Sequence, residues 1–161
     1  MKKFGKIMAG CDFSEYSKET LEYAASLAEK CQAELIVVNV INQRDVDTLL
    51  KIADKTFDRT VEKNVEKLAD DYVKRETENR TRQMKQLIEE IECAHLSIKK
   101  VVRMGVPFQE LTKATENEQA DLLVIGPKGR GNLADILFGS NAEKLFRHCP
   151  VPLLSVRHKK R

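Results

Sequence analysis

The sequence predicts an α/β fold, namely an open five-stranded parallel sheet with helices on both faces and the strand order 3-2-1-4-5. The first observation is that strand-like apolar segments alternate along the chain with segments of helical periodicity. The second is that the stretches AELIVVNVI and DLLVIG contain near-continuous apolar runs, as expected for strands covered on both faces. At 161 residues, the chain has the length of a single domain, 1–161.

The first three elements are a strand, a helix and a strand. Residues 4–11 form the first strand because they contain the apolar run IMAGC. Residues 15–31 are predicted to form an amphipathic helix, because apolar residues recur there at helical spacing. Ser14 is the expected N-cap of this helix. Residues 33–41 are the second strand.

The segment 43–93 is predicted to be an extended helical part of the same domain. It carries two stripes of apolar residues at helical spacing, which are Phe57, Val61, Val65, Leu68 and Tyr72, and then Met84, Leu87, Ile88 and Ile91. Between the stripes, residues 74–83 include no apolar side chain, so they are either exposed helix or a break between two helices. The segment is longer than one crossover helix needs, and we expect it to offer an arm to a protein partner.

The last elements continue the alternation. Residues 97–104 are the third strand, and a helix follows from Pro107, which suits the first helical turn, to about residue 117. Residues 121–126 are the fourth strand, 140–148 a helix and 151–157 the fifth strand.

Composition excludes several classes of function. The net charge of +3 is too weak to indicate nucleic-acid binding, and the basic tail 157–161 is expected to be solvated. No apolar run approaches the roughly 18 residues of a membrane helix, and the N-terminus does not resemble a signal peptide, so we expect a cytoplasmic protein. The four cysteines lack the spacing of a zinc site or a disulfide framework and are expected to be small apolar fillers; they are Cys11, Cys31, Cys93 and Cys149.

Two polar or glycine-rich segments follow strands whose carboxyl ends share one edge of the predicted sheet. Asp12 follows the first strand, and the loop GPKGRGNLADILFGS, 126–140, follows the fourth. Open α/β sheets bind ligands at this edge, next to the topological switch point. The loop contains no GxxxxGK, so it is not a P-loop. The relaxed dinucleotide pattern, Gly129, Gly131 and Ala134, follows the fourth strand and not the first, where it belongs.

The loop has a more specific spacing. Gly126, Gly129, Gly139 and Ser140 follow the pattern G-x2-G-x9-G-(S/T), which resembles the ATP-binding branch of the universal stress protein (UspA) family. The segments CDFSEYSKETLEYAASLA, RMGVPFQELTKATENEQADLLVIGPKGRG and GSNAEKLFRHCPVPLLSVR also resemble that family. The likeness covers nearly the whole chain outside 43–93 and is strongest in the C-terminal third.

The resemblance implies a Rossmann-like fold of the adenine nucleotide alpha hydrolase type, with ATP, ADP or AMP as its cofactor. Glycine amides would approach the phosphates closely, at a helix start that favours anions. Asp12 would bind the ribose, and Val40 would pair its backbone with adenine. The complete implied site is Gly10, Cys11, Asp12, Val40, Ile125, Gly126, Gly129, Arg130, Gly139, Ser140 and Asn141.

The resemblance also implies a cytoplasmic homodimer, paired through the last strand, that serves as a regulatory or protective module in the stress response. It leaves open whether Mg²⁺ accompanies the nucleotide and whether ATP is slowly hydrolysed. One departure from the family is Phe13, which is bulky beside the implied ribose site.

Three alternatives remain at this point. Ser140 and Glu143 have the spacing of a capping box, so Ser140 has a structural role available without any ligand. An enzyme that activates its substrate by adenylation can share this sheet, but the segment AGCDFSEYS lacks the paired glycines of the SGGxDS motif. A member that has lost its nucleotide would act by protein contact alone.

Overall fold

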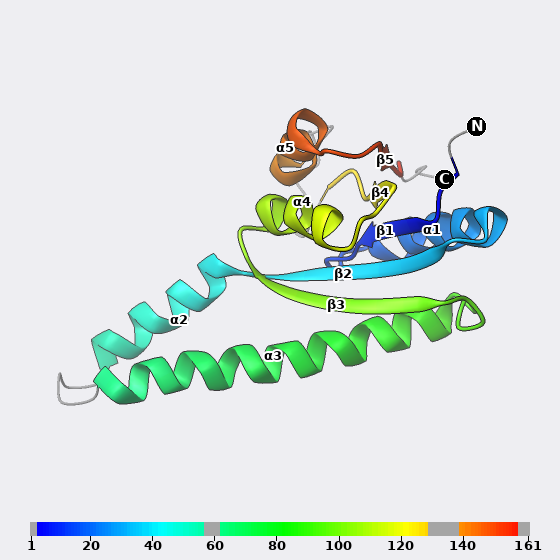
Figure 1. The fold of residues 1–161 in the computed structure, drawn as a ribbon. Coiled ribbons are helices and arrows are strands. Elements are labelled where there is room, and N and C mark those ends of the chain that lie inside the picture. The colour runs from blue at the N-terminus through cyan, green and yellow to red at the C-terminus, as the bar shows by residue number, and fades with distance from the viewer. Residues whose placement is uncertain (1–2, 57–61, 129–138, 158–161) are drawn as a thin grey trace.

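A computed structural model describes residues 3–56, 62–128 and 139–157. Five parallel strands form one sheet in the order β3-β2-β1-β4-β5, which confirms the predicted order (Figure 1). The strands are β1 (Lys6–Gly10), β2 (Glu34–Asn42), β3 (Ile98–Gly105), β4 (Leu122–Ile125) and β5 (Leu153–Ser155). The order reverses between β1 and β4, so the chain segments that leave the carboxyl ends of these two strands diverge there.

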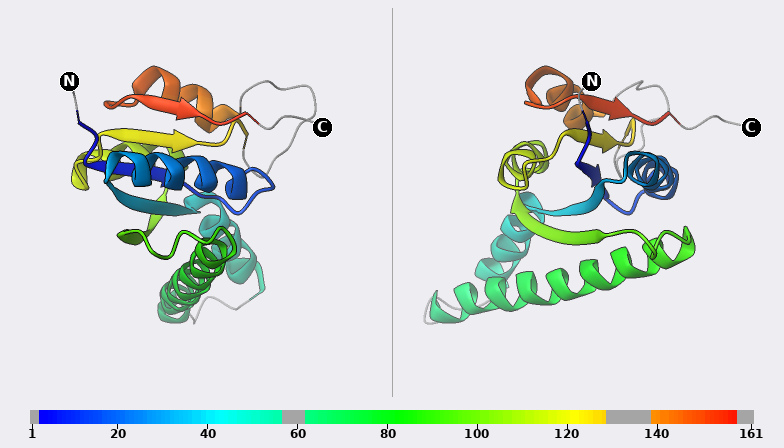
Figure 2. Two further views of the ribbon diagram at one scale, coloured as in Figure 1. Left: turned by 90° about the vertical axis from the view of Figure 1, so that its right-hand side faces the viewer. Right: turned by 45° about the vertical axis from the view of Figure 1, so that its right-hand side comes forward.

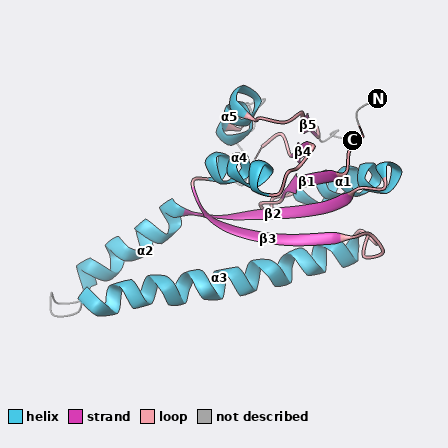
Figure 3. Ribbon diagram, in the orientation of Figure 1, coloured by secondary structure: helices cyan, strands magenta, loops and turns pink. Residues whose placement is uncertain are grey.

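Helices cover both faces of the sheet (Figures 2 and 3). They are α1 (Ser17–Cys31), α2 (Gln43–Thr56), α3 (Glu62–Glu90), α4 (Pro107–Asn117) and α5 (Ser140–His148). Side chains of α1 and α3 join one buried apolar cluster, and side chains of α4 and α5 join the other. Among the helices of the described residues, none is long and apolar enough to span a membrane.

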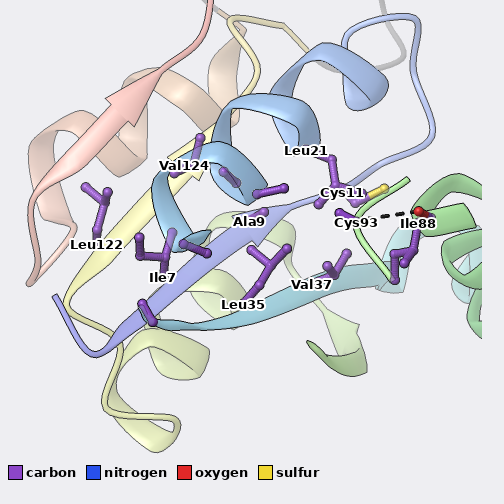
Figure 4. Packing of buried hydrophobic residues seen from close by; sticks show 14 of the residues in the cluster. Ile7, Ala9, Cys11, Leu21, Leu35, Val37, Ile88, Cys93, Leu122 and Val124 are labelled. Carbon is purple, nitrogen blue, oxygen red and sulfur yellow. Dashed lines mark hydrogen bonds between the residues drawn. The ribbon is translucent and has the colours of Figure 1, made fainter. Parts of the chain in front are cut away.

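Alternating residues of the central strands supply the two clusters. Ile7 and Leu35 pack toward α1 and α3 (Figure 4), whereas Met8 and Ile36 pack toward α4 and α5. All four side chains are fully buried. The strands are continuously apolar because successive side chains point to opposite faces and both faces are covered.

The first helix begins later than the sequence predicts. It starts at Ser17, its N-cap is Tyr16, and no side chain makes a capping hydrogen bond. Ser14 is therefore not the N-cap. Instead, the backbone N–H of Ser14 donates to Oδ1 of Asp12 at 3.0 Å, so the residues between β1 and α1 are organised around the Asp12 carboxylate.

The segment 43–93 contains two long helices, and the stretch 74–83 is continuous helix within α3. The helix is not exposed throughout this stretch, because Arg80 within it is only 7% exposed. Of the first apolar stripe, Phe57 and Val61 lie outside the described residues. The helices α2 and α3 contact each other and extend past the carboxyl edge of the sheet (Figure 1).

The four cysteines are free thiols. Cys11 and Cys93 are buried, and Cys31 and Cys149 are half-buried. Burial raises the pKa of the Cys93 and Cys149 thiols, which disfavours the reactive thiolate. The four cysteines are therefore buried or half-buried, as small apolar side chains would be.

Candidate functional site

A cavity of about 450 Å³ opens at the carboxyl edge of the sheet, next to the ends of β1, β2 and β4. Nine of the eleven residues singled out in the sequence line it, and they are Gly10, Cys11, Asp12, Val40, Ile125, Gly126, Gly139, Ser140 and Asn141. The other two, Gly129 and Arg130, lie outside the described residues. The parallel register brings the ends together, since Gly10 pairs with Val38 of β2.

Asp12 is held in a defined orientation. Its Oδ1 accepts one hydrogen bond from the backbone N–H of Ser14 and another from the hydroxyl of Ser17, each at 3.0 Å. Because one donor lies in the turn between β1 and α1 and the other is the first residue of α1, the carboxylate is oriented by the fold itself. A preorganised carboxylate is suited to accept hydrogen bonds from the hydroxyl groups of a ligand.

Gly126 allows β4 to end close to α1. A Cβ atom at this position would lie 3.2 Å from Cβ of Tyr16 and 3.3 Å from Oγ1 of Thr20. Such distances are tighter than nearly all real Cβ contacts. Close packing against α1 therefore favours a glycine here, and Gly126 is also part of the cavity wall.

The start of α5 forms another part of the wall. Gly139 is its N-cap, and Ser140 is its first residue. The N–H of Gly139 donates to the carbonyl of Pro127 at 2.9 Å. This bond joins the two ends of the glycine loop and uses an amide that could otherwise bind a ligand. The first-turn amides of Ser140 to Ala142 lack a partner within the helix, as at any helix N-terminus, and such ends favour anions.

The capping box considered from the sequence is not formed. No side chain caps α5, and Glu143 is instead paired with Arg147 at 3.0 Å. Ser140 is exposed and lines the cavity. Its hydroxyl is therefore not used to hold the helix start.

The wall has an apolar part and a polar part that the sequence analysis did not assign. The added apolar residues are Val38, Pro107, Leu111, Ala142 and Leu145, and the added polar residues are Ser14, Tyr16, Ser17, Thr20, Asn39, Asn42, Asp45 and Arg80. Lys128 also lines the cavity and belongs to the glycine loop already singled out in the sequence. Asn39 had a visible signal, because it interrupts the apolar run AELIVVNVI. Arg80 had none, since it lies in a polar helical stretch far from the motif.

The charges of the wall are separated by element. Asp12 and Asp45 follow β1 and β2, and Lys128 follows β4 and belongs to the glycine loop. Arg80 comes from α3, and its charge is paired with Glu76. Within the part of the chain that the structure describes, no group of three His, Cys, Asp or Glu side chains is arranged to hold a metal ion. An anionic group is therefore best accommodated beside Lys128 and α5, away from the two carboxylates.

Sheet order, helical layers and a polar cavity at the strand-order reversal define a doubly wound α/β protein with its ligand cavity at the topological switch point. The model of the universal stress protein family matches residues 3–157. The chain belongs to the universal stress protein family.

Relatives match over nearly their full length. Universal stress protein MJ0577 of Methanocaldococcus jannaschii is 27% identical over 162 residues, covering 97% of this chain and 96% of the relative. Universal stress protein YxiE of Bacillus subtilis is 24% identical, covering 96% of this chain and 99% of the relative. The solved structure of MJ0577 has a TM-score of 0.81 at 26% identity and covers 99% of this chain and 100% of that chain.

More distant structures share the fold. Universal stress protein UspA from Lactobacillus plantarum has a TM-score of 0.70 at 18% identity, covering 98% of this chain and 100% of that chain. A universal stress protein in complex with cAMP has a TM-score of 0.59 at 19% identity, covering 97% of this chain and 98% of that chain.

Proposed function

We propose that this protein binds ATP, or the related ADP or AMP, in the cavity at the carboxyl edge of its sheet. In this proposal it acts as a nucleotide-dependent regulatory or protective module of the cytoplasmic stress response. One observation carries the proposal: the nine described residues of the sequence motif line a single cavity, although they come from four separate parts of the chain. Its volume of about 450 Å³ lies in the usual range of small-molecule sites.

Each part of the nucleotide has a chemically suited part of the wall. The adenine ring would lie against the apolar side chains Val40, Pro107 and Leu111, with the Val40 backbone pairing to its edge. The ribose would meet Asp12. The phosphates would lie at the first turn of α5, beside Lys128, where helix amides and a cation both favour negative charge.

The ligand class has independent support from a protein of the same fold, which was solved in complex with cAMP, itself an adenine nucleotide. Mg²⁺, if bound with ATP, would be held mainly by phosphate oxygens and water, as is usual for this ion. We propose no catalytic residue, and hydrolysis of ATP would be at most slow.

We further propose that the protein forms a homodimer through β5. This strand pairs with β4 on one side and ends the strand order of the sheet on the other. An edge strand that carries Leu153 and Leu154 presents unpaired backbone groups beside apolar side chains, which favours pairing with another strand. The hairpin of α2 and α3 would remain available to a protein partner.

Calorimetric titration of the purified protein with ATP, ADP and AMP tests the nucleotide proposal. Asp12→Ala should weaken ATP binding by about 1.5–3 kcal/mol, the usual contribution of hydrogen bonds to a charged group. Ser140→Ala should cost about 0.5–1.5 kcal/mol, because its hydroxyl is a neutral donor. Ser26→Ala, at an exposed position of α1, is the matched control and should bind as the parent does.

Thermal melting of each variant separates lost binding from lost folding, which matters for Asp12 because it also holds the α1 start. Mass spectrometry of small molecules released on denaturation would detect nucleotide that co-purifies. A parent protein that releases no nucleotide and gives no binding heat with any of the three would refute the proposal. Formation of AMP and pyrophosphate from ATP would instead favour an adenylating enzyme.

A further inference from the structure

Arg80 reaches the cavity from α3 and keeps hydrogen-bonding capacity there. The residue is 7% exposed and lines the cavity. Its Nε donates to Oε2 of Glu76 at 3.0 Å, and its guanidinium carbon lies 5.8 Å from the centre of the Phe13 ring. Among the described residues, its two terminal nitrogens donate no hydrogen bond to the protein. A guanidinium has five N–H donors, so a buried one with most donors unused is suited to an acceptor from a ligand.

Two further polar groups of the same cavity are incompletely paired. Asn39 is 1% exposed, and its Nδ2 donates to the carbonyl of Cys11 at 2.7 Å. Within the described residues, Asn39 Oδ1 and Ser14 Oγ are buried without a hydrogen-bond partner. Both residues line the cavity. Buried polar atoms are nearly always paired, so these two atoms are available to form hydrogen bonds with a ligand.

The three groups converge on the residues between β1 and α1. Asn39 is bonded to Cys11, Ser14 lies three positions further along, and Arg80 lies against Phe13. Asp12 is in the same short stretch. The wall around Asp12 therefore offers one acceptor at Asn39, donors at Arg80 and a hydroxyl at Ser14 that can do either.

The local charge decides which ligand group fits. The guanidinium of Arg80 is paired with the carboxylate of Glu76, so its positive charge is already compensated, and Asp12 adds a negative charge to the same cavity. A phosphate here would meet a net negative surrounding and be repelled. A pair of neutral hydroxyl groups fits, because each hydroxyl can donate to Asn39 or Asp12 and accept from Arg80.

We propose that Ser14, Asn39 and Arg80 form a ribose-recognition wall around Asp12, which selects nucleotides with free 2′ and 3′ hydroxyls. The wall discriminates against deoxynucleotides, because the buried groups then lose their partners. It also discriminates against nucleotides with a phosphate on the 2′ or 3′ oxygen. This inference rests on the nucleotide-binding function proposed above and assigns its specificity to a residue of the long helix α3.

Competitive calorimetry with ATP and 2′,3′-dideoxy-ATP tests the wall. The parent should bind ATP at least tenfold more tightly than the dideoxy analogue. Arg80→Met should lower this ratio about fivefold or more, because the donors to the hydroxyls are removed. Arg80→Lys keeps the charge and some donors and should retain part of the ratio. Arg82→Met, an exposed position two residues along α3, is the matched control and should leave the ratio unchanged.

A second measurement needs no variant, so it stands even if Arg80→Met fails to fold. The parent should bind adenosine 3′,5′-bisphosphate at least tenfold more weakly than AMP. Equal affinities in this pair, or equal affinities for ATP and its dideoxy analogue, would overturn the ribose-recognition wall while nucleotide binding stands. A parent that binds neither ATP, ADP nor AMP would overturn both the wall and the proposed function.

Discussion

The hydroxyl of Ser17 donates a 3.0 Å hydrogen bond to Oδ1 of Asp12, five residues earlier in the chain. Ser17 is the first residue of α1 and is 5% exposed. The start of the helix therefore orients the carboxylate at the end of β1, and the two elements fix its position before any ligand arrives. Such preorganisation lowers the entropic cost of binding.

Replacing Ser17 with alanine should weaken ATP binding by about 0.5–1.5 kcal/mol, the usual net value of one hydrogen bond. Asp12 remains present, so the loss comes from its less restricted orientation. Calorimetric titration measures the effect. Ser26→Ala, which changes an exposed serine on the same helix, should leave the affinity unchanged. An unaltered affinity of Ser17→Ala would show that ATP binding does not depend on this hydrogen bond to Asp12.

Gly126→Ala should destabilise the fold by about 1–3 kcal/mol, the usual cost of overpacking. The new Cβ would lie 3.2 Å from Cβ of Tyr16, so β4 and α1 would have to move apart. Urea unfolding measures the change. The control is Gly5→Ala, because a Cβ there would meet Asp121 Oδ2 at 3.6 Å, an ordinary contact. Equal stability of the two variants would show that α1 can shift to accommodate the new Cβ at no cost in stability.

The fold was predictable because its signals are local. Each strand is a short apolar run and each helix a periodic stripe, so the strands and helices follow from local patterns, whereas the strand order is a property of the fold class. The bounds differ by a few residues where hydrogen bonding decides, as at Ser14, whose backbone bonds Asp12 and thereby delays the helix to Ser17.

The candidate site was predictable only where a motif marks it. The spacing of the glycines and Ser140 identified both ends of the loop. Arg80 was beyond sequence reasoning, because its burial depends on how α3 lies along the sheet. Ser140 is a different case: its capping spacing with Glu143 was visible, but Glu143 pairs with Arg147 instead. Local patterns reveal which pairings are available, whereas tertiary packing selects among them.

The proposed dimer predicts that Leu154→Lys will yield a monomer. Leu154 lies in β5 at one end of the sheet, and a lysine there would place a charge beside the paired strands, which opposes edge association. Light scattering gives the mass. Met104→Lys, at an exposed position of β3 at the opposite edge, should leave the dimer intact. A dimer that persists in Leu154→Lys would move the interface away from β5.

Glu110 holds the end of β3 against α4. Its carboxylate accepts 2.9 Å hydrogen bonds from Lys113 Nζ and Arg103 Nε, and the residue is 8% exposed. The side chain of Glu110 packs against Gly105, where a Cβ atom would lie 2.7 Å from Glu110 Cγ. This close approach favours a glycine at position 105. The hydrogen bond from Lys113, followed by that from Arg103, holds the pKa of this carboxyl below its ordinary value of 4.5, against the opposing effect of burial.

Since the pKa of Glu110 is lower in the folded chain, the ionised carboxylate favours folding. This stabilisation is present above about pH 4.5 and is lost as the pH falls through the folded pKa. Glu110→Gln should therefore reduce the free energy of unfolding at pH 7 by about 1.5–3 kcal/mol, the usual range for hydrogen bonds to a charged group. The difference from the parent should shrink as the pH falls below 4.5, because the parent carboxyl then becomes protonated and neutral like the amide.

Urea unfolding at a series of pH values measures both the deficit at pH 7 and its decrease at low pH. Glu116→Gln, at an exposed position on the same helix, should match the parent throughout. A deficit in Glu110→Gln that stays constant down to pH 3 would mean that side-chain shape, and not the charge, holds β3 to α4.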